Sequence, residues 1–158
     1  MARILICYYS RSGNTKKMAY LIQQGVMEAD VEVDTKEVKA VQLKDLPDYD
    51  GIILGSPTYY GGPAAPMKDL LDKSVKYHGK LQGKVGGAFS SSTNIGGGNE
   101  TTVLALLQGL LIHGMVVVGD SEGDHYGPVA IEAPDRRSEK NCIRYGRRVA
   151  QLVKKLQG

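Results

Sequence analysis

Six consecutive residues near the N-terminus combine hydroxyl, amide and guanidinium groups with one glycine. They are Ser10, Arg11, Ser12, Gly13, Asn14 and Thr15. The run follows a short apolar segment (3–9) and precedes an amphipathic pattern of helical spacing that begins at residue 14. The first amides of a helix have no partner within the helix, and the helix dipole favours an anion there. The run therefore predicts a phosphate-binding turn, in which Gly13 permits close approach of the backbone.

Two phosphate-binding motifs are missing from the turn, and their absence limits the class of phosphate ligand that it can bind. A Walker loop carries a lysine after its last glycine, whereas Gly13 is followed by Asn14, and the pattern GxGxxG is absent. Arg11 is the only fixed cation in the turn, which favours a single terminal phosphate over a triphosphate with magnesium. An ordinary helix N-cap that binds no ligand is the alternative explanation of the same residues.

Two later segments have similar chemistry. "SPTYYGG" (56–62) follows the apolar run 51–55, and its adjacent tyrosines suit contact with a flat ring, or the anchoring of a loop in the core. "SSSTNIGGGNE" (90–100) follows the run 84–90 and offers hydroxyls, an amide and bare backbone. These groups suit the polar edge of a heterocycle, although three successive glycines also fit plain flexibility.

Strand-like and helix-like patterns alternate along the chain. The expected strands are 3–9, 31–38, 51–55, 84–90 and 115–119, and the expected helices are 14–29, 67–75, 101–114 and 136–156. This alternation predicts one α/β domain over residues 1–158, with a parallel sheet covered by helices on both faces. Ligands of such sheets bind outside the carboxyl ends of the strands. Because the three polar loops all fall on that edge, they predict one ligand with a phosphate end and a flat ring end.

Composition limits the class of protein. Hydrophobic residues make up 42% and charged residues 23%, as in ordinary globular proteins. No apolar run is long enough to span a membrane, and the N-terminus does not resemble a signal peptide. Cys7 and Cys142 are expected to be reduced thiols of a cytoplasmic protein.

The net charge of +3 comes largely from the C-terminal segment. A basic segment of this kind fits either a nucleic-acid contact or the solvated face of a final helix, and the second interpretation is favoured. No nucleic-acid partner is expected, because no aromatic residues are interleaved with these basic ones and no known nucleic-acid module is recognised.

Several segments together resemble a known family. They are "YYSRSGNT", "GSPTYYGGPAAPMKDLLD", "FSSSTNIGGGNETT", "LLIHGMVVVG" and "IRYGRRVAQLVKKL". The chain resembles the flavodoxin-like superfamily nearly from end to end. Within it, the chain looks most like the FMN-dependent NAD(P)H:quinone oxidoreductases once named tryptophan-repressor-binding proteins.

The resemblance implies a three-layer fold with strand order 2-1-3-4-5 and non-covalent FMN. It implies that the residues of the turn 10–15 hold the phosphate and that two further groups surround the flavin ring. The first group is Pro57, Thr58, Tyr59, Tyr60 and Gly61, and the second is Ser91, Ser92, Thr93, Asn94, Ile95 and Gly96. His113 corresponds to the family's histidine near the flavin, where it either bonds the quinone or caps its helix. Tyr126 is a further candidate for the same pocket, whereas His125 is expected on the surface.

The resemblance further implies that FMN passes two electrons from NAD(P)H to a small-molecule quinone. A flavodoxin that carries electrons between redox partner proteins is the main alternative, and a scaffold with a vestigial site is a third. The chain departs from the family before the expected fourth strand, where it has only "KYHGKLQG" (76–83), and before the third strand. Since such segments help to build the family's tetramer, a homo-oligomer (dimer or tetramer) is left open.

Overall fold

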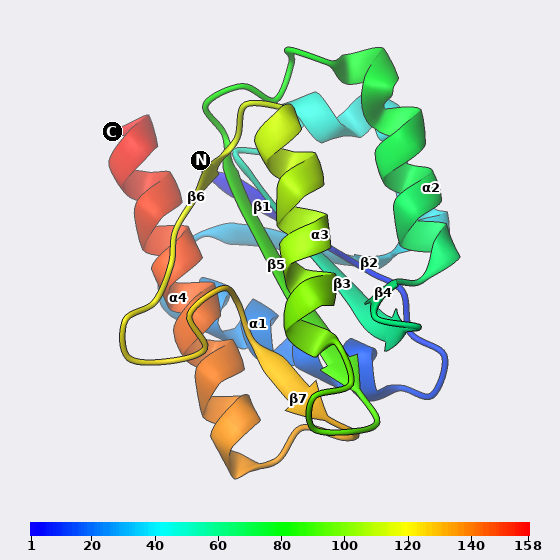
Figure 1. Cartoon of the computed structure of the whole chain (residues 1–158). Helices are drawn as coiled ribbons and strands as arrows, with labels where there is room; N and C mark the ends of the chain where they lie inside the picture. The colour runs from blue at the N-terminus through cyan, green and yellow to red at the C-terminus, as the bar shows by residue number, and fades with distance from the viewer.

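The computed structural model describes residues 1–158 and joins all the strands into one sheet with helices on both faces (Figure 1). The strands are β1 (Arg3–Tyr8), β2 (Glu32–Glu37), β3 (Gly51–Tyr59), β4 (Gly62–Pro63), β5 (Val85–Ser92), β6 (Val116–Val117) and β7 (Val129–Ile131). The α-helices are α1 (Asn14–Glu28), α2 (Ala65–Lys73), α3 (Asn99–Ile112) and α4 (Arg136–Gln157). Short 3₁₀ helices cover Val38–Ala40, Leu43–Asp48 and Ser74–Tyr77.

The main strands are parallel and follow the order β2-β1-β3-β5-β6. This confirms the predicted order 2-1-3-4-5, with β5 as its fourth strand. Two strands are longer than predicted, because β3 continues to Tyr59 and β5 continues to Ser92. Both extensions reach into segments that the sequence assigned to loops.

The fifth strand differs from its prediction, which placed it continuously over 115–119. The strand is divided in two. β6 pairs with Val85–Gly86 of β5, and β7 pairs with Ser90–Ser92 on the same edge of β5. The loop 118–128 interrupts the strand, and hydrogen bonds from α4 hold its first residues. Arg148 donates a hydrogen bond to the carbonyl of Gly119 (2.6 Å), and Arg144 donates one to the carboxylate of Asp120 (2.7 Å).

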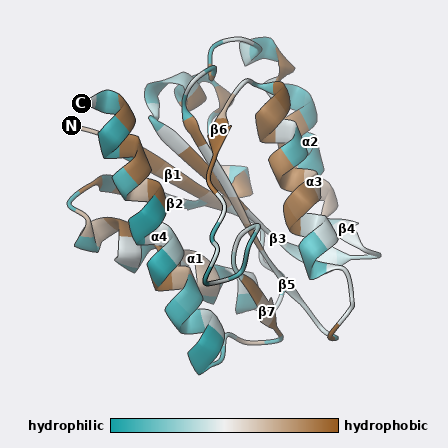
Figure 2. Ribbon diagram, turned by 60° about the vertical axis from the view of Figure 1, so that its left-hand side comes forward, coloured by the Kyte–Doolittle hydropathy of each residue, from teal (hydrophilic) through white to brown (hydrophobic).

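Alternate residues of the central strands feed two separate apolar cores. Ile4 and Ile6 of β1 pack beneath α1 and α4, whereas Leu5 and Cys7 pack beneath α2 and α3. This period of two is the geometry of an extended strand buried on both faces. In Figure 2 the inner side of α4 is brown and its outer side teal, so this helix covers the sheet with one apolar stripe.

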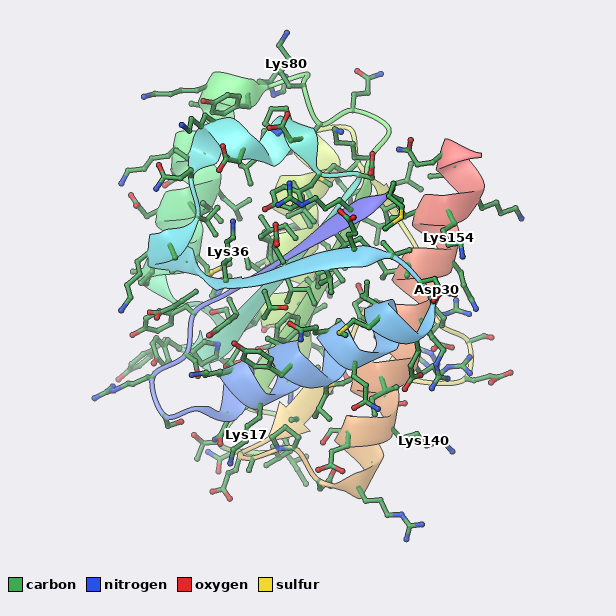
Figure 3. The ribbon with its side chains drawn as sticks, turned by 180° about the vertical axis from the view of Figure 1, so that it is seen from behind. Lys17, Asp30, Lys36, Lys80, Lys140 and Lys154 are labelled. Carbon is green, nitrogen blue, oxygen red and sulfur yellow. The ribbon has the colours of Figure 1, made fainter.

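Helices α1 and α4 pack against each other at unusually short range through glycine. A Cβ atom built on Gly25 lies 1.9 Å from the carbonyl oxygen of Ile143, and one built on Gly146 lies 2.1 Å from that of Ile22. Any larger residue at either position forces the helices apart. Figure 3 shows the pair from behind, with Lys17 near the start of α1 and Lys140 near the start of α4.

Four of the eight basic residues of α4 pair with acidic groups of the same chain. Arg144 pairs with Asp120 at 2.7 Å, and Arg147 pairs with Glu28 at 2.7 Å. These four pairs tie α4 to α1 and to the loop 118–128.

Both cysteines are free and buried, and burial raises the pKa of each thiol to about 12. At neutral pH they are protonated and chemically inert. Among the helices, none has both the length and the apolar character needed to cross a bilayer.

Candidate functional site

A cleft opens at the carboxyl edge of the sheet, where the segments after β1, β3 and β5 meet. Ten of its eleven lining residues belong to the predicted set, and the eleventh, Glu132, was not predicted. The ten are Arg11, Ser12, Asn14, Thr15, Pro57, Thr58, Tyr59, Ser91, Ser92 and Thr93. The structure thus brings together residues from three loops that are far apart in the sequence.

The turn before α1 leaves backbone donors open. Gly13 is the N-cap in a left-handed conformation (φ 99°), which any larger residue adopts only under strain. The Ser10 hydroxyl accepts hydrogen bonds from the amides of Gly13 (3.1 Å) and Lys16 (3.2 Å), so Ser10 shapes the turn and does not line the cleft. The amides of Asn14 and Thr15 have no acceptor within the chain. This donor set fits the oxygens of a phosphate monoester.

Hydroxyl pairs join the loops around the cleft. Thr15 Oγ1 and Ser91 Oγ share a hydrogen bond of 2.9 Å, which links the start of α1 to β5. Thr58 Oγ1 and Ser90 Oγ share one of 3.0 Å, which links β3 to β5. These contacts fix the relative positions of the polar groups before any ligand arrives.

The two adjacent tyrosines have different surroundings. Tyr59 ends β3 and pairs with Gly62 of β4, so the segment is a hairpin and not the irregular loop that the sequence predicted. Tyr60 and Gly61 form its turn, both with positive φ (49° and 78°), and Tyr60 is fully exposed away from the cleft. Tyr59 is 38% exposed and lines the cleft, with its ring edge-on to that of Tyr9 at 6.4 Å between centroids. Burial, followed by the hydroxyl of Tyr9, raises the pKa of Tyr59.

The glycine-rich loop after β5 touches the hairpin. A Cβ on Gly98 (φ 104°) would lie 2.7 Å from the Cα of Gly61, so only glycine fits this crossing. The Thr101 hydroxyl donates a hydrogen bond of 2.7 Å to the Gly61 carbonyl. Asn94, Ile95 and Gly96 are exposed outside the cleft, and their amides have no acceptor within the chain. These amides are free to bind the carbonyl edge of a heterocycle lying at the rim.

The structure does not bring His113 to the cleft. The residue follows α3, whose first turn lies at the carboxyl edge, so the helix of 14 residues carries it about 21 Å towards the opposite edge. There its Nε2 lies 2.7 Å from Ser74 Oγ, and its buried Nδ1 has no partner. Burial and the neighbouring His78 lower the pKa of His113. Within one chain, His113 joins the C-terminal ends of α2 and α3.

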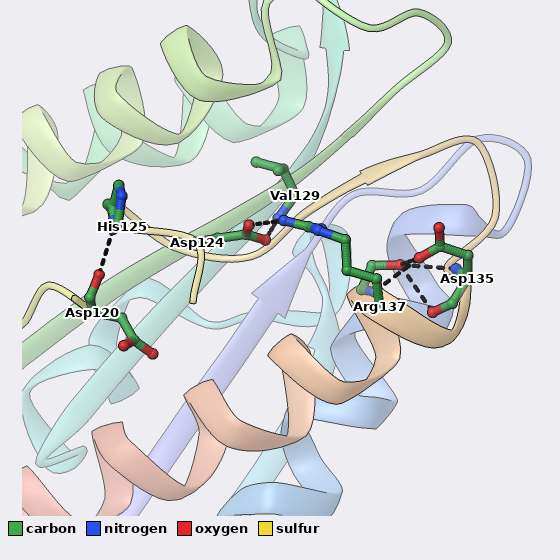
Figure 4. Close-up of polar contacts among 7 residues, drawn as sticks. Asp120, Asp124, His125, Val129, Asp135 and Arg137 are labelled. Carbon is green, nitrogen blue, oxygen red and sulfur yellow. Dashed lines mark hydrogen bonds and ion pairs between the residues drawn. The ribbon is translucent and has the colours of Figure 1, made fainter. Parts of the chain in front are cut away.

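Tyr126 also lies outside the main cleft, in the loop 118–128. It lines a separate pocket with Glu100, Val103 and His125. Figure 4 shows how this loop is held: His125 Nδ1 lies 2.7 Å from the Asp120 carbonyl oxygen, and the Asp124 carboxylate accepts from the amide of Val129 (3.0 Å) and pairs with Arg137.

Glu132 was missed because the strand before it was missed. β7 has three residues inside a segment rich in glycine, proline and charge, with no alternating pattern. Its pairing with Ser90–Ser92 carries the next residue, Glu132, to the carboxyl edge. Recognition of "VAI" as the resumed fifth strand was the signal that would have found it.

Known proteins match the chain along most of its length. The family of NADPH-dependent FMN reductases matches residues 3–123. A flavodoxin of Clostridium saccharobutylicum is 35% identical, with 98% of this chain and 99% of the relative covered. An NAD(P)H dehydrogenase (quinone) of Archaeoglobus fulgidus is 32% identical, with 99% and 100% covered.

A solved structure is similar over the same extent. The flavodoxin, WrbA-like protein from Agrobacterium tumefaciens superposes with a TM-score of 0.85 at 27% identity, with 98% of this chain and 99% of that chain covered. The topology, the polar cleft at the carboxyl edge and these matches agree. The chain has a flavodoxin-like fold and belongs to the NADPH-dependent FMN reductase family.

Proposed function

We propose that this chain binds FMN without a covalent bond and uses it to reduce quinones with NAD(P)H, two electrons at a time. The observation that carries the proposal is the cleft in which three loops present hydroxyl groups, with the unpaired amides of Asn14 and Thr15, beside one exposed tyrosine ring. A phosphate monoester with a flat heterocycle matches that arrangement. The bound flavin supplies the redox chemistry, and the protein supplies binding, orientation and electrostatics.

Each part of the cleft has a task in this proposal. The amides of Asn14 and Thr15, with the hydroxyl of Ser12, hold the phosphate, and Arg11 adds a positive charge. Thr58 and Ser91 fix the geometry through their hydrogen bonds to Ser90 and Thr15. Tyr59 offers one ring face at the rim, where a flat heterocycle stacks.

The loop 93–98 supports the ring's polar edge. The amides of Asn94, Ile95 and Gly96 are free donors, and such donors stabilise negative charge that develops on a reduced heterocycle. Tyr59 and Ile95 are both exposed (38% and 90%), so a second flat molecule could reach a flavin held beside them. That access suits NAD(P)H and a quinone in turn.

The alternative is a flavodoxin, which passes single electrons between partner proteins. It is favoured by the relative from C. saccharobutylicum, which is called a flavodoxin and is covered over 99% of its length. The relative from A. fulgidus, called an NAD(P)H dehydrogenase (quinone), supports the enzyme.

The deciding experiment measures NAD(P)H oxidation by the FMN-loaded protein with benzoquinone as acceptor. The proposal predicts turnover well above that of an equal concentration of free FMN, with one quinone reduced per NAD(P)H. Turnover equal to that of free FMN contradicts the enzyme. If the two one-electron potentials of the bound cofactor are also widely separated, the flavodoxin alternative replaces it.

A further inference from the structure

Glu132 brings a carboxylate into a cleft that is otherwise lined by hydrogen-bond donors. The other polar side chains of the cleft carry hydroxyl, amide or guanidinium groups, and Glu132 is the only acidic residue among the eleven. An ionised carboxylate accepts hydrogen bonds and donates none. A site designed for a phosphate alone gains nothing from such a group, because like charges repel.

The backbone holds Glu132 at this position. The amide of Glu132 donates a hydrogen bond of 2.7 Å to the carbonyl of Ser92, which continues the β5–β7 pairing by one residue. Its φ of 58° is left-handed, a conformation that residues with side chains rarely adopt. The chain thus turns sharply just after β7, at an exposed residue that lines the cleft.

The carboxylate of Glu132 is also free. It forms no ion pair and no side-chain hydrogen bond, although Arg11 lines the same cleft. By contrast, Asp120 and Asp124 of the preceding loop are both paired with arginines of α4. A free acceptor beside open donors fits a ligand that carries both an anion and several hydroxyl groups.

We propose that Glu132 makes the cleft selective for a phosphate ester of a polyol over a bare phosphate. Its carboxylate repels every phosphate dianion that enters the turn, and hydrogen bonds from the hydroxyls of the ribityl chain offset this cost for FMN alone. This inference rests on the proposed binding of FMN and adds to it the residue that rejects simple phosphates. Selectivity of this kind needs a repulsive element as well as attractive contacts.

The test compares three ligands on the wild-type protein and on Glu132→Gln. Dissociation constants of FMN and riboflavin are measured by quenching of flavin fluorescence, and that of inorganic phosphate by calorimetry on the apoprotein. The ratio of the phosphate constant to the FMN constant is expected to fall by about tenfold or more in Glu132→Gln. Phosphate binds more tightly in that variant because the repulsion is gone, and riboflavin binds more weakly because the charged acceptor is gone. FMN undergoes both changes, so the ratio reports the lost contacts to its hydroxyls.

Two further variants serve as controls, one for poor folding of the glutamine variant and one for the loss of a negative charge elsewhere. Glu132→Gly removes the carboxylate while accepting the left-handed backbone, so the same change in the ratio is expected even if the glutamine variant folds poorly. Glu32→Gln removes an exposed carboxylate at the amino end of β2 and leaves the ratio unchanged.

The possible failures are distinguishable. If the wild-type protein ignores FMN, the proposed function and this inference both fall. If the wild-type protein binds FMN but the ratio shifts by less than about twofold in both Glu132 variants, the inference is wrong and the proposed function stands.

Discussion

Helices α1, α3 and α4 all begin at the carboxyl edge of the sheet, but their first turns are completed differently. At α4, the Asp135 carboxylate accepts from the Ser138 amide (2.9 Å), and the Ser138 hydroxyl accepts from the Asp135 amide (2.8 Å). At α1 and α3, the N-caps are Gly13 and Gly98, neither of which can offer a side-chain acceptor.

The difference between α1 and α4 follows the position of the cleft. The start of α4, away from the cleft, satisfies its own amides with a capping box. The start of α1 leaves the amides of Asn14 and Thr15 without acceptors, and these two residues line the cleft. The open amides of α1 are therefore available to an anionic ligand, whereas α4 satisfies amides at its own start. Gly98 leaves the start of α3 uncapped as well, but its first turn does not line the cleft.

The largest expected effect on FMN binding comes from placing a carboxylate at the start of α1, where α4 already has one. In Ser12→Glu, a carboxylate occupies the place of the phosphate and repels it, so FMN affinity falls by about 100-fold or more. The stability of the apoprotein does not fall with it, because a negative charge near a helix start is favourable. Fluorescence titration and thermal unfolding measure the two quantities. FMN affinity within about tenfold of wild type contradicts the assignment of this turn.

The next effect concerns the two tyrosines of the hairpin. Tyr59→Ala weakens FMN binding by about 0.5–3 kcal/mol if its ring stacks on the flavin. Tyr60→Ala is the matched control, because its side chain is fully exposed and outside the cleft. Equal losses in both variants, or none in either, reject the assignment of Tyr59 as the stacking residue.

Removal of the capping box at α4 has a smaller effect, and it lowers stability instead of FMN affinity. Ser138→Ala destabilises the fold by about 1 kcal/mol, since the Asp135 amide loses its acceptor. FMN affinity is unchanged, because α4 begins outside the cleft. Urea unfolding and the flavin titration test both statements. A loss of FMN affinity in this variant shows that the start of α4 belongs to the site after all.

The smallest effect lies at the far end of α3 and depends on pH. Because burial lowers the pKa of His113 in the folded state, folding favours the neutral imidazole. Its contribution to stability is complete above the unfolded pKa of about 6.5 and is lost as pH falls through the lower folded pKa. The unfolding free energy of His113→Gln therefore changes less between about pH 7 and pH 5 than that of wild type. Parallel curves for the two proteins contradict this reasoning.

The sequence predicted the fold because each central element carries its own local signal. The apolar run of β1 and the helical period of α1 need no distant contact to be recognised, and alternation of such units leads directly to a parallel sheet. The three loops of the cleft followed from that topology, since each comes directly after a strand. Ten of the cleft residues were found in this way.

Most of the predictions that differ from the structure concern features that depend on contacts between distant segments. β7 has three residues and exists because β5 supplies a partner edge, so neither it nor Glu132 has a local signal. The hairpin turn places Tyr60 at positive φ, a position where sequence rules expect glycine or asparagine. His113 is different, because its distance from the cleft was predictable. A helix that begins at the carboxyl edge must end near the opposite edge.

The most direct test of the account is a titration of the apoprotein with FMN. The unpaired amides of Asn14 and Thr15 predict binding at micromolar concentration or tighter, with quenching of flavin fluorescence at one FMN per chain. They also predict that riboflavin, which lacks the phosphate, binds far more weakly. A protein that leaves FMN fluorescence unchanged, or binds riboflavin equally well, contradicts the central claim that this turn holds a phosphate.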